Sequence, residues 1–506
     1  MLKKIRITIA VLLFTAITFY FLDFVGVLPS SFPNLARIQF IPALLSGTLV
    51  VLGLLLLLTF LFGRIYCSAI CPLGILQDVV AWFARRINRK KRYSFSREKK
   101  WLRYIVLGGV VVAFFLGGTV VLSLLDPYSA FGRMAVNVFR PVYMGINNLG
   151  AAVLNHFDNY SLYHTDIYVL SLFSLLAGII TFLIVAFLAY RYGRTYCNTI
   201  CPVGTVLGVI SRWSLWRVRI DREACISCGL CERKCKSSCI DSKGKTVDGS
   251  RCVACYNCIT SCHKQALSYR PVWKKAAVEV ARADAGKRQF FAALAVTALA
   301  VVPRKTWAIE ITSMGGNKPY KKQHPLSPPG AVSAAHLLDH CTACHLCVAK
   351  CPSRVLKPAF MEYGVGGMMQ PMMDFEHGFC NFDCTVCTEV CPNGALLKLT
   401  KQEKHTLQVG QVVFVKENCI VYTEETSCGA CSEHCPTQAV SMQPYKNGLT
   451  IPVVNPDICV GCGGCEYVCP VRPFRAIYIE GNPVHQQAVP FKEAEKKEIE
   501  LDGFGF

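Results

Sequence analysis

Four long apolar stretches dominate the first 190 residues of the chain. They cover Ile7–Leu28, Ile41–Phe62, Tyr104–Leu125 and Ile167–Tyr190. Each exceeds the ~20 residues that an α-helix needs to cross the hydrocarbon core of a bilayer, and Asp23 is the only charged residue within them. The pattern predicts four transmembrane helices. A cleaved signal peptide is the alternative for the first stretch, but that stretch is longer than a usual signal core and lacks a clear cleavage site.

A sequence repeat follows the second and the fourth stretch. Residues 63–74 (GRIYCSAICPLG) and residues 193–204 (GRTYCNTICPVG) are identical at 8 of 12 positions. Each copy comes directly after the second apolar stretch of a pair. We therefore expect residues 1–210 to form an α-helical membrane domain of two related helical hairpins, with both cysteine motifs at the cytoplasmic surface.

Much of the net charge of +21 flanks the apolar stretches. Ten Lys and Arg residues lie between Arg85 and Arg103, whereas the loops at 29–40 and 126–166 hold few. Because Lys and Arg accumulate on the cytoplasmic side of membrane proteins, both ends of the four-helix domain should be cytoplasmic. Contact with the anionic lipid of a bilayer accounts for this charge better than binding to nucleic acid.

The rest of the chain divides into three parts. Residues 211–286 form a small cysteine-rich module, residues 287–333 hold a signal-like apolar run and a linker, and residues 334–506 form a second cysteine-rich domain. The run Phe290–Pro303 has 14 residues, which is short for a free-standing membrane span. A buried helix, an export-signal core and a fifth membrane anchor all fit that length.

The cysteines after residue 210, which are 25 of the 29 in the chain, are spaced as metal ligands. In the first module they form two quartets with C-x2-C-x2-C-x3-C spacing. This is typical of two-cluster bacterial ferredoxins, where the fourth cysteine of each quartet ligates the other cluster. The pattern predicts one cluster on Cys225, Cys228, Cys231 and Cys262, and a second on Cys252, Cys255, Cys258 and Cys235. Cys239 is a spare thiol that could substitute for Cys235.

The C-terminal domain repeats this theme four times, and every quartet ends in Cys-Pro. The quartets are Cys341, Cys344, Cys347 and Cys351; Cys380, Cys384, Cys387 and Cys391; Cys419, Cys428, Cys431 and Cys435; and Cys459, Cys462, Cys465 and Cys469. With the first module, they predict six [4Fe–4S] clusters in ferredoxin-like α+β domains. Adjacent and nested exchange of the fourth ligands both fit. Structural zinc is the alternative, but zinc sites rarely need a third cysteine two residues after a pair.

The repeat contributes four more cysteines, Cys67, Cys71, Cys197 and Cys201. Residues four positions apart lie on one face of a helix, and two related hairpins would bring both pairs together. Four thiolates would then hold a further metal or cluster, or form a redox-active dithiol site. Packing of helix ends is the alternative, because a free cysteine often behaves as a small buried hydrophobic residue.

Two acidic residues occupy related positions in the two hairpins. Asp23 and Asp126 each follow a leucine near the outer end of the first helix of a hairpin. Intramembrane carboxylates often belong to proton relays, so both are candidates to accept protons released by quinol oxidation. His156 and His164 are weaker candidates. Helix capping or exposure to solvent is the alternative for each of the four.

Together these motifs resemble a known family. Residues 1–275 are similar to the membrane quinol-dehydrogenase subunit of periplasmic nitrate reductase (Nap-type) systems, with four helices, two Cys-x3-Cys-Pro motifs and a two-cluster ferredoxin. Residues 287–506 resemble its exported partner, a four-cluster polyferredoxin that begins with a twin-arginine signal. Lys287-Arg288-Gln-Phe-Phe is similar to that signal, with lysine in place of the first arginine. The chain therefore looks like a fusion of the two subunits.

The resemblance implies a multi-pass protein of the bacterial inner membrane, with residues 211–286 cytoplasmic and residues 334–506 periplasmic. As a quinol dehydrogenase or electron-transfer subunit, it would oxidise menaquinol or ubiquinol in the helical domain. Electrons would then pass through the clusters to a periplasmic reductase or a c-type cytochrome. The alternative is an assembly or maturation factor for metal centres, similar to copper-oxidase ferredoxins, but four extra clusters have no evident use there. A redox regulator lacks a supporting DNA-binding motif.

Overall fold

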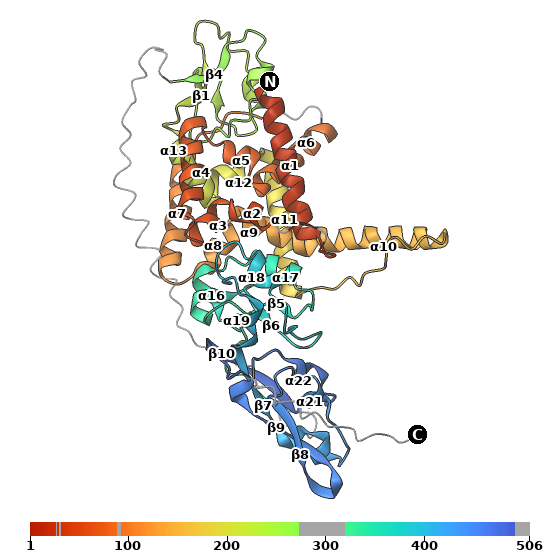
Figure 1. Cartoon of the computed structure of the whole chain (residues 1–506). Coiled ribbons are helices and arrows are strands. Elements are labelled where there is room, and N and C mark those ends of the chain that lie inside the picture. Colours follow the sequence, from red (N-terminus) through yellow and green to blue (C-terminus); the bar gives the residue numbers. More distant parts are fainter. Residues whose placement is uncertain (27, 30–31, 89–92, 273–318, 491–506) are drawn as a thin grey trace.

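The computed structural model describes the chain except for residues 27, 30–31, 89–92, 273–318 and 491–506. Three parts follow one another along an elongated molecule (Figure 1). The first cysteine module lies at one end, the helical domain in the middle, and the C-terminal domain at the other end. The predicted apolar anchor Phe290–Pro303 and the signal-like Lys287-Arg288 motif fall outside the described residues.

The helical domain, residues 1–211, is a bundle with a buried aromatic and aliphatic core. Its elements are α1 (Leu2–Leu22), α2 (Pro33–Arg37), α3 (Phe40–Leu45), α4 (Leu49–Phe62), α5 (Ile65–Ala69), α6 (Pro72–Ile87), α7 (Lys100–Phe115), α8 (Thr119–Leu125), α9 (Pro127–Met134), the π-helix η1 (Ala135–Phe139), α10 (Arg140–His156), α11 (Leu172–Tyr192), α12 (Thr195–Thr199) and α13 (Pro202–Ser211).

Two of the four predicted spans are single long helices and two are broken. Within the described residues, α1 and α11 are long and apolar enough to cross a membrane. The stretch Ile41–Phe62 is divided between α3 and α4, and Tyr104–Leu125 between α7 and α8. Gly47 and Gly117 stand at these breaks with φ of 67° and 77°, a conformation that glycine adopts without steric cost. An uninterrupted apolar stretch therefore did not guarantee an uninterrupted helix.

Helix α10 leaves the bundle and projects sideways at the level where the helical domain meets the C-terminal domain (Figure 1). Its exposed apolar side chains recur every three or four residues, at Val142, Ile146, Leu149 and Val153. That spacing places them on one face of the helix. The helix therefore carries an apolar stripe along its outer length.

The first module is a small α+β unit, as its cysteine spacing predicts. Strand β1 (Trp216–Ile220) pairs antiparallel with β4 (Leu267–Pro271), and β2 (Ile240–Asp241) with β3 (Thr246–Val247). One short helix, α14 (Leu230–Lys234), and the 3-10 turn η2 (Ile259–Ser261) complete it. Their core is formed largely by cysteine, valine and isoleucine side chains.

The C-terminal domain is also α+β, with short helices and three antiparallel strand pairs. β5 (Leu356–Pro358) pairs with β6 (Pro371–Met373), β7 (Leu407–Phe414) with β10 (Ile477–Gln487), and β8 (Val440–Pro444) with β9 (Thr450–Val454). Its helices and 3-10 turns are α16 (Ala334–His340), α17 (Leu346–Lys350), η4 (Val365–Gly367), α18 (Val386–Val390), α19 (Lys401–His405), η5 (Lys416–Asn418), α20 (Ile420–Thr423), α21 (Ala430–Glu433), η6 (Lys446–Gly448), η7 (Pro456–Ile458) and α22 (Gly464–Val468).

Candidate metal centres

The cysteines of the C-terminal domain gather in four sets, and each set combines three cysteines of one quartet with the last cysteine of its neighbour. The electrostatic interactions among the thiols define the sets. We name them site C (Cys341, Cys344, Cys347, Cys391), site D (Cys351, Cys380, Cys384, Cys387), site E (Cys435, Cys459, Cys462, Cys465) and site F (Cys419, Cys428, Cys431, Cys469). The structure thus groups the fourth cysteine of each quartet with the adjacent quartet, one of the two arrangements that the sequence leaves open.

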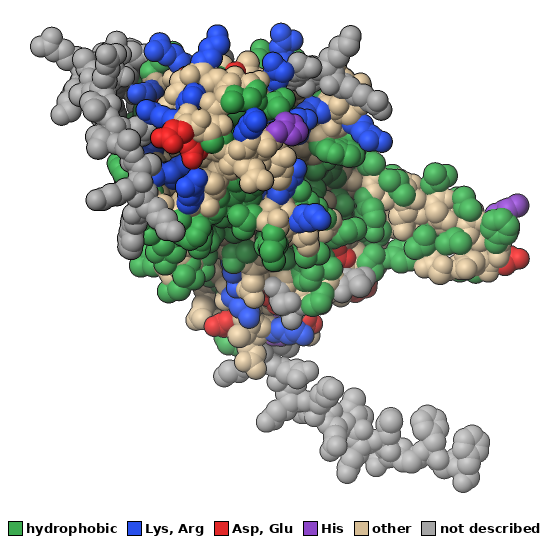
Figure 2. Space-filling model, turned by 90° about the horizontal axis from the view of Figure 1, so that it is seen from above, with side chains coloured by type: hydrophobic (Ala, Val, Ile, Leu, Met, Phe, Trp, Pro, Cys, Tyr) green, Lys and Arg blue, Asp and Glu red, His purple; other side chains and the backbone are tan. Residues whose placement is uncertain are grey.

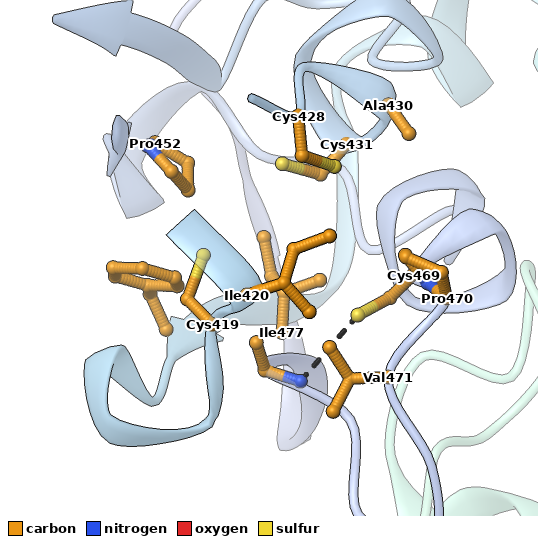
Figure 3. Close-up of a pocket in the computed structure, with 12 residues that line it drawn as sticks. Cys419, Ile420, Cys428, Ala430, Cys431, Pro452, Cys469, Pro470, Val471 and Ile477 are labelled. Atoms are coloured by element: carbon orange, nitrogen blue, oxygen red, sulfur yellow. Dashed lines mark hydrogen bonds between the residues drawn. The ribbon is translucent and has the colours of Figure 1, made fainter. Parts of the chain in front are cut away.

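Site F shows the space that such a set encloses. Its four cysteines line a cavity with an empty volume of about 360 Å³, together with apolar residues such as Ile420 and Val471. Figure 3 shows the sulfur atoms directed into this space from separate segments. The cysteines of site D line a similar cavity of about 340 Å³. A thiol-lined apolar cavity fits a cubane cluster, which carries its own inorganic sulfur and needs thiolates around it.

Single zinc ions are the alternative to clusters at these sites. Among the residues that the structure describes, no group of three or more His, Cys, Asp or Glu side chains is arranged to hold one metal ion. The preference for clusters rests on the ferredoxin-type spacing of the cysteines and on the thiol-lined cavities of sites D and F.

The backbone conformation of the cysteine loops allows backbone N–H groups to donate hydrogen bonds to cysteine sulfur atoms. The N–H groups of Ala343 and Gly461 donate to Cys341 and Cys459 at 3.4 Å in both cases, and both donors have positive φ. In the C-terminal domain a proline follows each fourth cysteine, and Cys351 is extended with φ −68° and ψ 113°, the conformation that a residue before proline favours. Hydrogen bonds to a thiolate favour its charged form.

The four sites follow one another in a line that leads away from the helical domain. Cys347 of site C interacts with Cys387 of site D. The N–H of Cys380 in site D donates to the carbonyl of Cys462 in site E at 2.9 Å, and Cys465 of site E interacts with Cys431 of site F. Site C lies against the helical domain, and site F belongs to the part of the domain farthest from it (Figure 1).

The first module brings three cysteines of its second quartet together with the last cysteine of its first quartet. Cys235, Cys252, Cys255 and Cys258, named site B, line a cavity of about 330 Å³ that Cys239 also borders. Cys231 interacts electrostatically with Cys225 and Cys228, and the helix that carries Cys231, α14, packs on η2, which Cys262 directly follows. We name these four cysteines site A. The Sγ atoms of Cys235 and Cys239 lie 3.5 Å apart, and this contact lowers the pKa of Cys235 to about 7.

The loop of site C docks into a notch of the helical domain. A side chain on Gly132 of α9 would place its Cβ 2.5 Å from the carbonyl oxygen of Cys344, so only glycine fits there. Ser123 donates to the carbonyl of Thr342 at 2.8 Å, and Arg133 donates to that of Ala343 at 3.3 Å. Burial at this junction raises the pKa of Cys344 to about 12.

His345 lies in the same loop and is enclosed by both domains. Its Nε2 is 3.0 Å from the carbonyl of Met369 and its Nδ1 is 3.3 Å from the hydroxyl of Ser174 on α11. Burial lowers the pKa of His345 to about 3, so the ring is neutral. Cys341, Cys344 and His345 also match the Cys-x-x-Cys-His spacing of c-type haem attachment. Both ring nitrogens of His345 already have hydrogen-bond partners, and both thiols belong to site C. We therefore interpret this spacing as part of the cluster-binding loop and not as a site of haem attachment.

The structure separates the two predicted proton acceptors. Asp23 forms an ion pair with Lys350 of α17 at 2.6 Å, which makes it a link between the domains. Asp126 is 1% exposed and caps α9 through Ser129, while its Oδ1 has no hydrogen-bond partner among the described residues. The predicted histidines, His156 and His164, are exposed to solvent.

Three residues beside Asp126 were missed in the sequence. The hydroxyls of Tyr20 and Tyr128 are buried without a hydrogen-bond partner among the described residues, and so is Nε of Arg133. Tyr128 interacts electrostatically with Cys344, Tyr20 and Asp126. Buried polar groups without partners are rare and indicate a missing ligand or water. None of the three belongs to a spacing motif in the sequence that would have identified it.

The four cysteines of the repeat are brought together as predicted, but inside the protein. Cys67 lies on α5 and Cys197 on α12, and Cys71 and Cys201 precede α6 and α13. All four are at most 4% exposed. Cys201 interacts electrostatically with the other three. The four thiols are therefore covered by the protein itself, on the side of the helical domain that meets the first module, and their expected place at the cytoplasmic side of a membrane stays a prediction.

Comparison with known proteins agrees with cluster-binding domains. Models of a 4Fe-4S binding domain match residues 46–91 and 174–221, which contain the two repeats. Models of 4Fe-4S dicluster domains match residues 248–355 and 426–472. No solved structure matches the chain.

Several curated proteins are similar over part of the chain. "Ferredoxin-type protein NapF" of Escherichia coli (strain K12) is 28% identical over 162 residues, 32% of this chain and 90% of NapF. "Ferredoxin-type protein NapG" of the same strain is 30% identical over 28% of this chain and 65% of NapG. "Methylamine utilization ferredoxin-type protein MauN" of Methylobacillus flagellatus is 30% identical over 42% of this chain and 62% of MauN. The chain is thus homologous to ferredoxin-type proteins with 4Fe-4S domains.

Proposed function

We propose that the chain is a membrane-bound iron–sulfur protein that oxidises menaquinol or ubiquinol and delivers the electrons to a periplasmic reductase or a c-type cytochrome. It would combine the two kinds of subunit that its halves resemble. The main support is that cysteine sites lie at both ends of the helical domain, and that sites C to F lead away from it in a line. A [4Fe–4S] cluster bound there takes up and releases single electrons at a potential set by its surroundings.

A bilayer around the helical domain accounts for its exposed apolar surface. Leu49, Val50 and Leu54 on α4 are more than half exposed, as is usual for side chains that face lipid. The four spans then include the two broken helices, since irregular backbone is tolerated in a membrane where protein buries it. The apolar stripe of α10 fits an amphipathic helix lying in the membrane surface, next to the C-terminal domain.

The distribution of Lys and Arg side chains supports an orientation of the protein in the membrane. Figure 2 shows the end of the molecule that carries the first module, with Lys and Arg side chains scattered widely over it and few acidic ones. This end would face the cytoplasm under the positive-inside rule. The C-terminal domain, at the opposite end of the helical domain (Figure 1), would then be periplasmic, and the acceptor would dock near site F.

Asp126 is the proton acceptor in this proposal. Its free Oδ1 and the unpaired hydroxyls of Tyr20 and Tyr128 offer hydrogen-bonding groups to the hydroxyl of a quinol ring near Cys344. Asp23, held by Lys350, would position the C-terminal domain in place of accepting a proton. The junction between α9 and site C would therefore bind the quinol head group.

The test uses the full chain, purified without oxygen and reconstituted in liposomes. A reduced menaquinone analogue is added, and low-temperature EPR follows the reduction of the clusters. Quinol should reduce several clusters, and Asp126→Asn should slow the reaction by about 10²–10⁴-fold, the usual contribution of a general base. Asp166→Asn, at an exposed position, is the control. Reduction by dithionite but not by quinol would refute the quinol assignment while leaving the relay intact.

A further inference from the structure

The two copies of the sequence repeat form a paired structure around the four buried thiols. The guanidinium of Arg64, in the first copy, donates to the carbonyl of Cys197 at 3.0 Å. In the second copy, Arg194 occupies the equivalent position and donates to the carbonyl of Cys67. Each arginine thus crosses to the first cysteine of the other copy. The two copies of the sequence repeat therefore make equivalent contacts with each other, around the four thiols.

The glycine that ends each motif makes room for this crossing. A Cβ on Gly74 would lie 2.3 Å from the carbonyl of Cys67 and 2.9 Å from Arg194. A Cβ on Gly204 would lie 2.1 Å from the carbonyl of Cys197 and 2.9 Å from Arg64. Side chains are not accommodated at such distances. Each glycine is thus required for the same reason: a larger side chain would collide with the carbonyl of the first cysteine in its own copy and with the arginine of the other copy.

Of the two crossing arginines, Arg194 pairs with Asp78 at 2.7 Å, whereas Arg64 has no carboxylate partner among the described residues. Arg64 is fully buried, and its described hydrogen bonds go to an amide oxygen, two carbonyls and the thiol of Cys67. Its Nε and the Nη2 of Arg194 have no partner among the described residues. A buried guanidinium requires a compensating negative charge. Metal-bound thiolates would supply it, since the thiolate and not the thiol is the metal ligand.

We propose that Cys67, Cys71, Cys197 and Cys201 together hold one iron–sulfur cluster, shared between the two copies of the repeat. The four thiols lie close enough for Cys201 to interact electrostatically with the other three. The donor N–H of Gly204, 3.3 Å from Cys201 Sγ, and the amide of Gln77, 3.2 Å from Cys197 Sγ, stabilise thiolate. The two 4Fe-4S domain matches, at 46–91 and 174–221, would then form one site with two thiolates from each.

Its position would join the two groups of cysteine sites. The carbonyl of Lys236, next to Cys235 of site B, accepts the N–H of Arg194 at 2.8 Å. On the other side, Tyr66 interacts electrostatically with both Cys71 and Asp126. This role as a link between the first module and site C rests on the proposed function, whereas the metal site itself does not.

Native mass spectrometry of the full chain, purified anaerobically in detergent, tests the inference without any substitution. Six cysteine quartets plus this site give seven clusters, and the intact mass should match that number. A mass that matches six clusters, or one showing disulfides between the repeat cysteines, would overturn the proposal.

Paired variants then assign the extra cluster. Cys67→Ala and Cys197→Ala should each lower iron and acid-labile sulfide by one cluster equivalent. Ser68→Ala, at a buried neighbouring position on α5, should leave both unchanged. Unaltered iron and sulfide in the cysteine variants would refute the site. If seven clusters are present but quinol reduces none of them, the proposed function fails and the metal site stands.

Discussion

The two ends of the helical domain hold their cysteine-rich neighbours in different ways. At the first module, buried charges dominate: Asp78 of α6 accepts bonds from Arg6, Arg194 and Lys236. At the C-terminal domain, Ser123 and Arg133 donate hydrogen bonds to the backbone of the site C loop, and the ion pair Asp23–Lys350 lies beside them.

The difference shows what each junction must do. Buried cations close to sites with many thiolates balance negative charge, and they hold that end of the helical domain through charge. Both ends keep buried polar atoms without a partner among the described residues, at Arg64 and Arg194 near the first module and at Tyr20, Asp126 and Tyr128 near the C-terminal domain. We infer that the two junctions differ in how they are held: the first mainly by buried charge, and the second more by hydrogen bonds to the backbone of the site C loop.

Removing the carboxylate of Asp78, which three cations share, should lower the free energy of unfolding more than any other change considered below. In Asp78→Asn, three buried cations lose the negative charge that they share. Removing one partner from a buried ion pair costs about 3–5 kcal/mol, so the free energy of unfolding should fall by about that amount. Denaturant unfolding with parallel iron analysis measures it, and Asp166→Asn is the exposed control. An unchanged midpoint would show that charge does not hold this junction.

The ion pair at the other junction comes next. Lys350→Met removes the ammonium that lies 2.6 Å from the buried Asp23 carboxylate, at an expected cost of about 3 kcal/mol. The loss should appear as faster hydrogen exchange in α17 and the end of α1. The double variant Asp23→Asn/Lys350→Met should recover most of the protection, because both members of the pair are then neutral. If the double variant is as unprotected as the single one, the pair is not what links the domains.

The sequence predicted the chemistry of these regions better than their geometry. Cysteine spacing is local, so the quartets and the α+β modules could be predicted, whereas the pairing of adjacent quartets depends on tertiary contacts. Asp23 and Asp126 look equivalent in the sequence, yet Lys350, 327 residues away from Asp23, separates their roles. The sequence did not predict the helix breaks at Gly47 and Gly117. A run of apolar residues indicates that a segment is surrounded by apolar groups, but it does not indicate where the backbone leaves the helical conformation.

Adding a methyl group where α9 meets the site C loop should lower stability by a smaller amount. Gly132→Ala places a methyl group 2.5 Å from the carbonyl of Cys344, and overpacking of this kind costs about 1–3 kcal/mol. Gly145→Ala on α10 is the matched control, since its Cβ would meet its nearest neighbour at 3.8 Å. The two variants are compared by hydrogen exchange in the site C loop. Equal protection in both would mean that the loop does not dock in the notch at Gly132.

The smallest effect tests whether burial, and not the number of charges, makes the first junction strong. Arg212 pairs with Glu98 at 3.2 Å but its side chain is 37% exposed, whereas Arg103, which shares Glu98, is 1% exposed. Because exposed pairs contribute about 0–1 kcal/mol, Arg212→Ala should shift the unfolding midpoint only slightly, and less in high salt than in low salt. If its cost approached that of Asp78→Asn, surface charge would hold the junction, and the contrast between the two ends would lose its basis in burial.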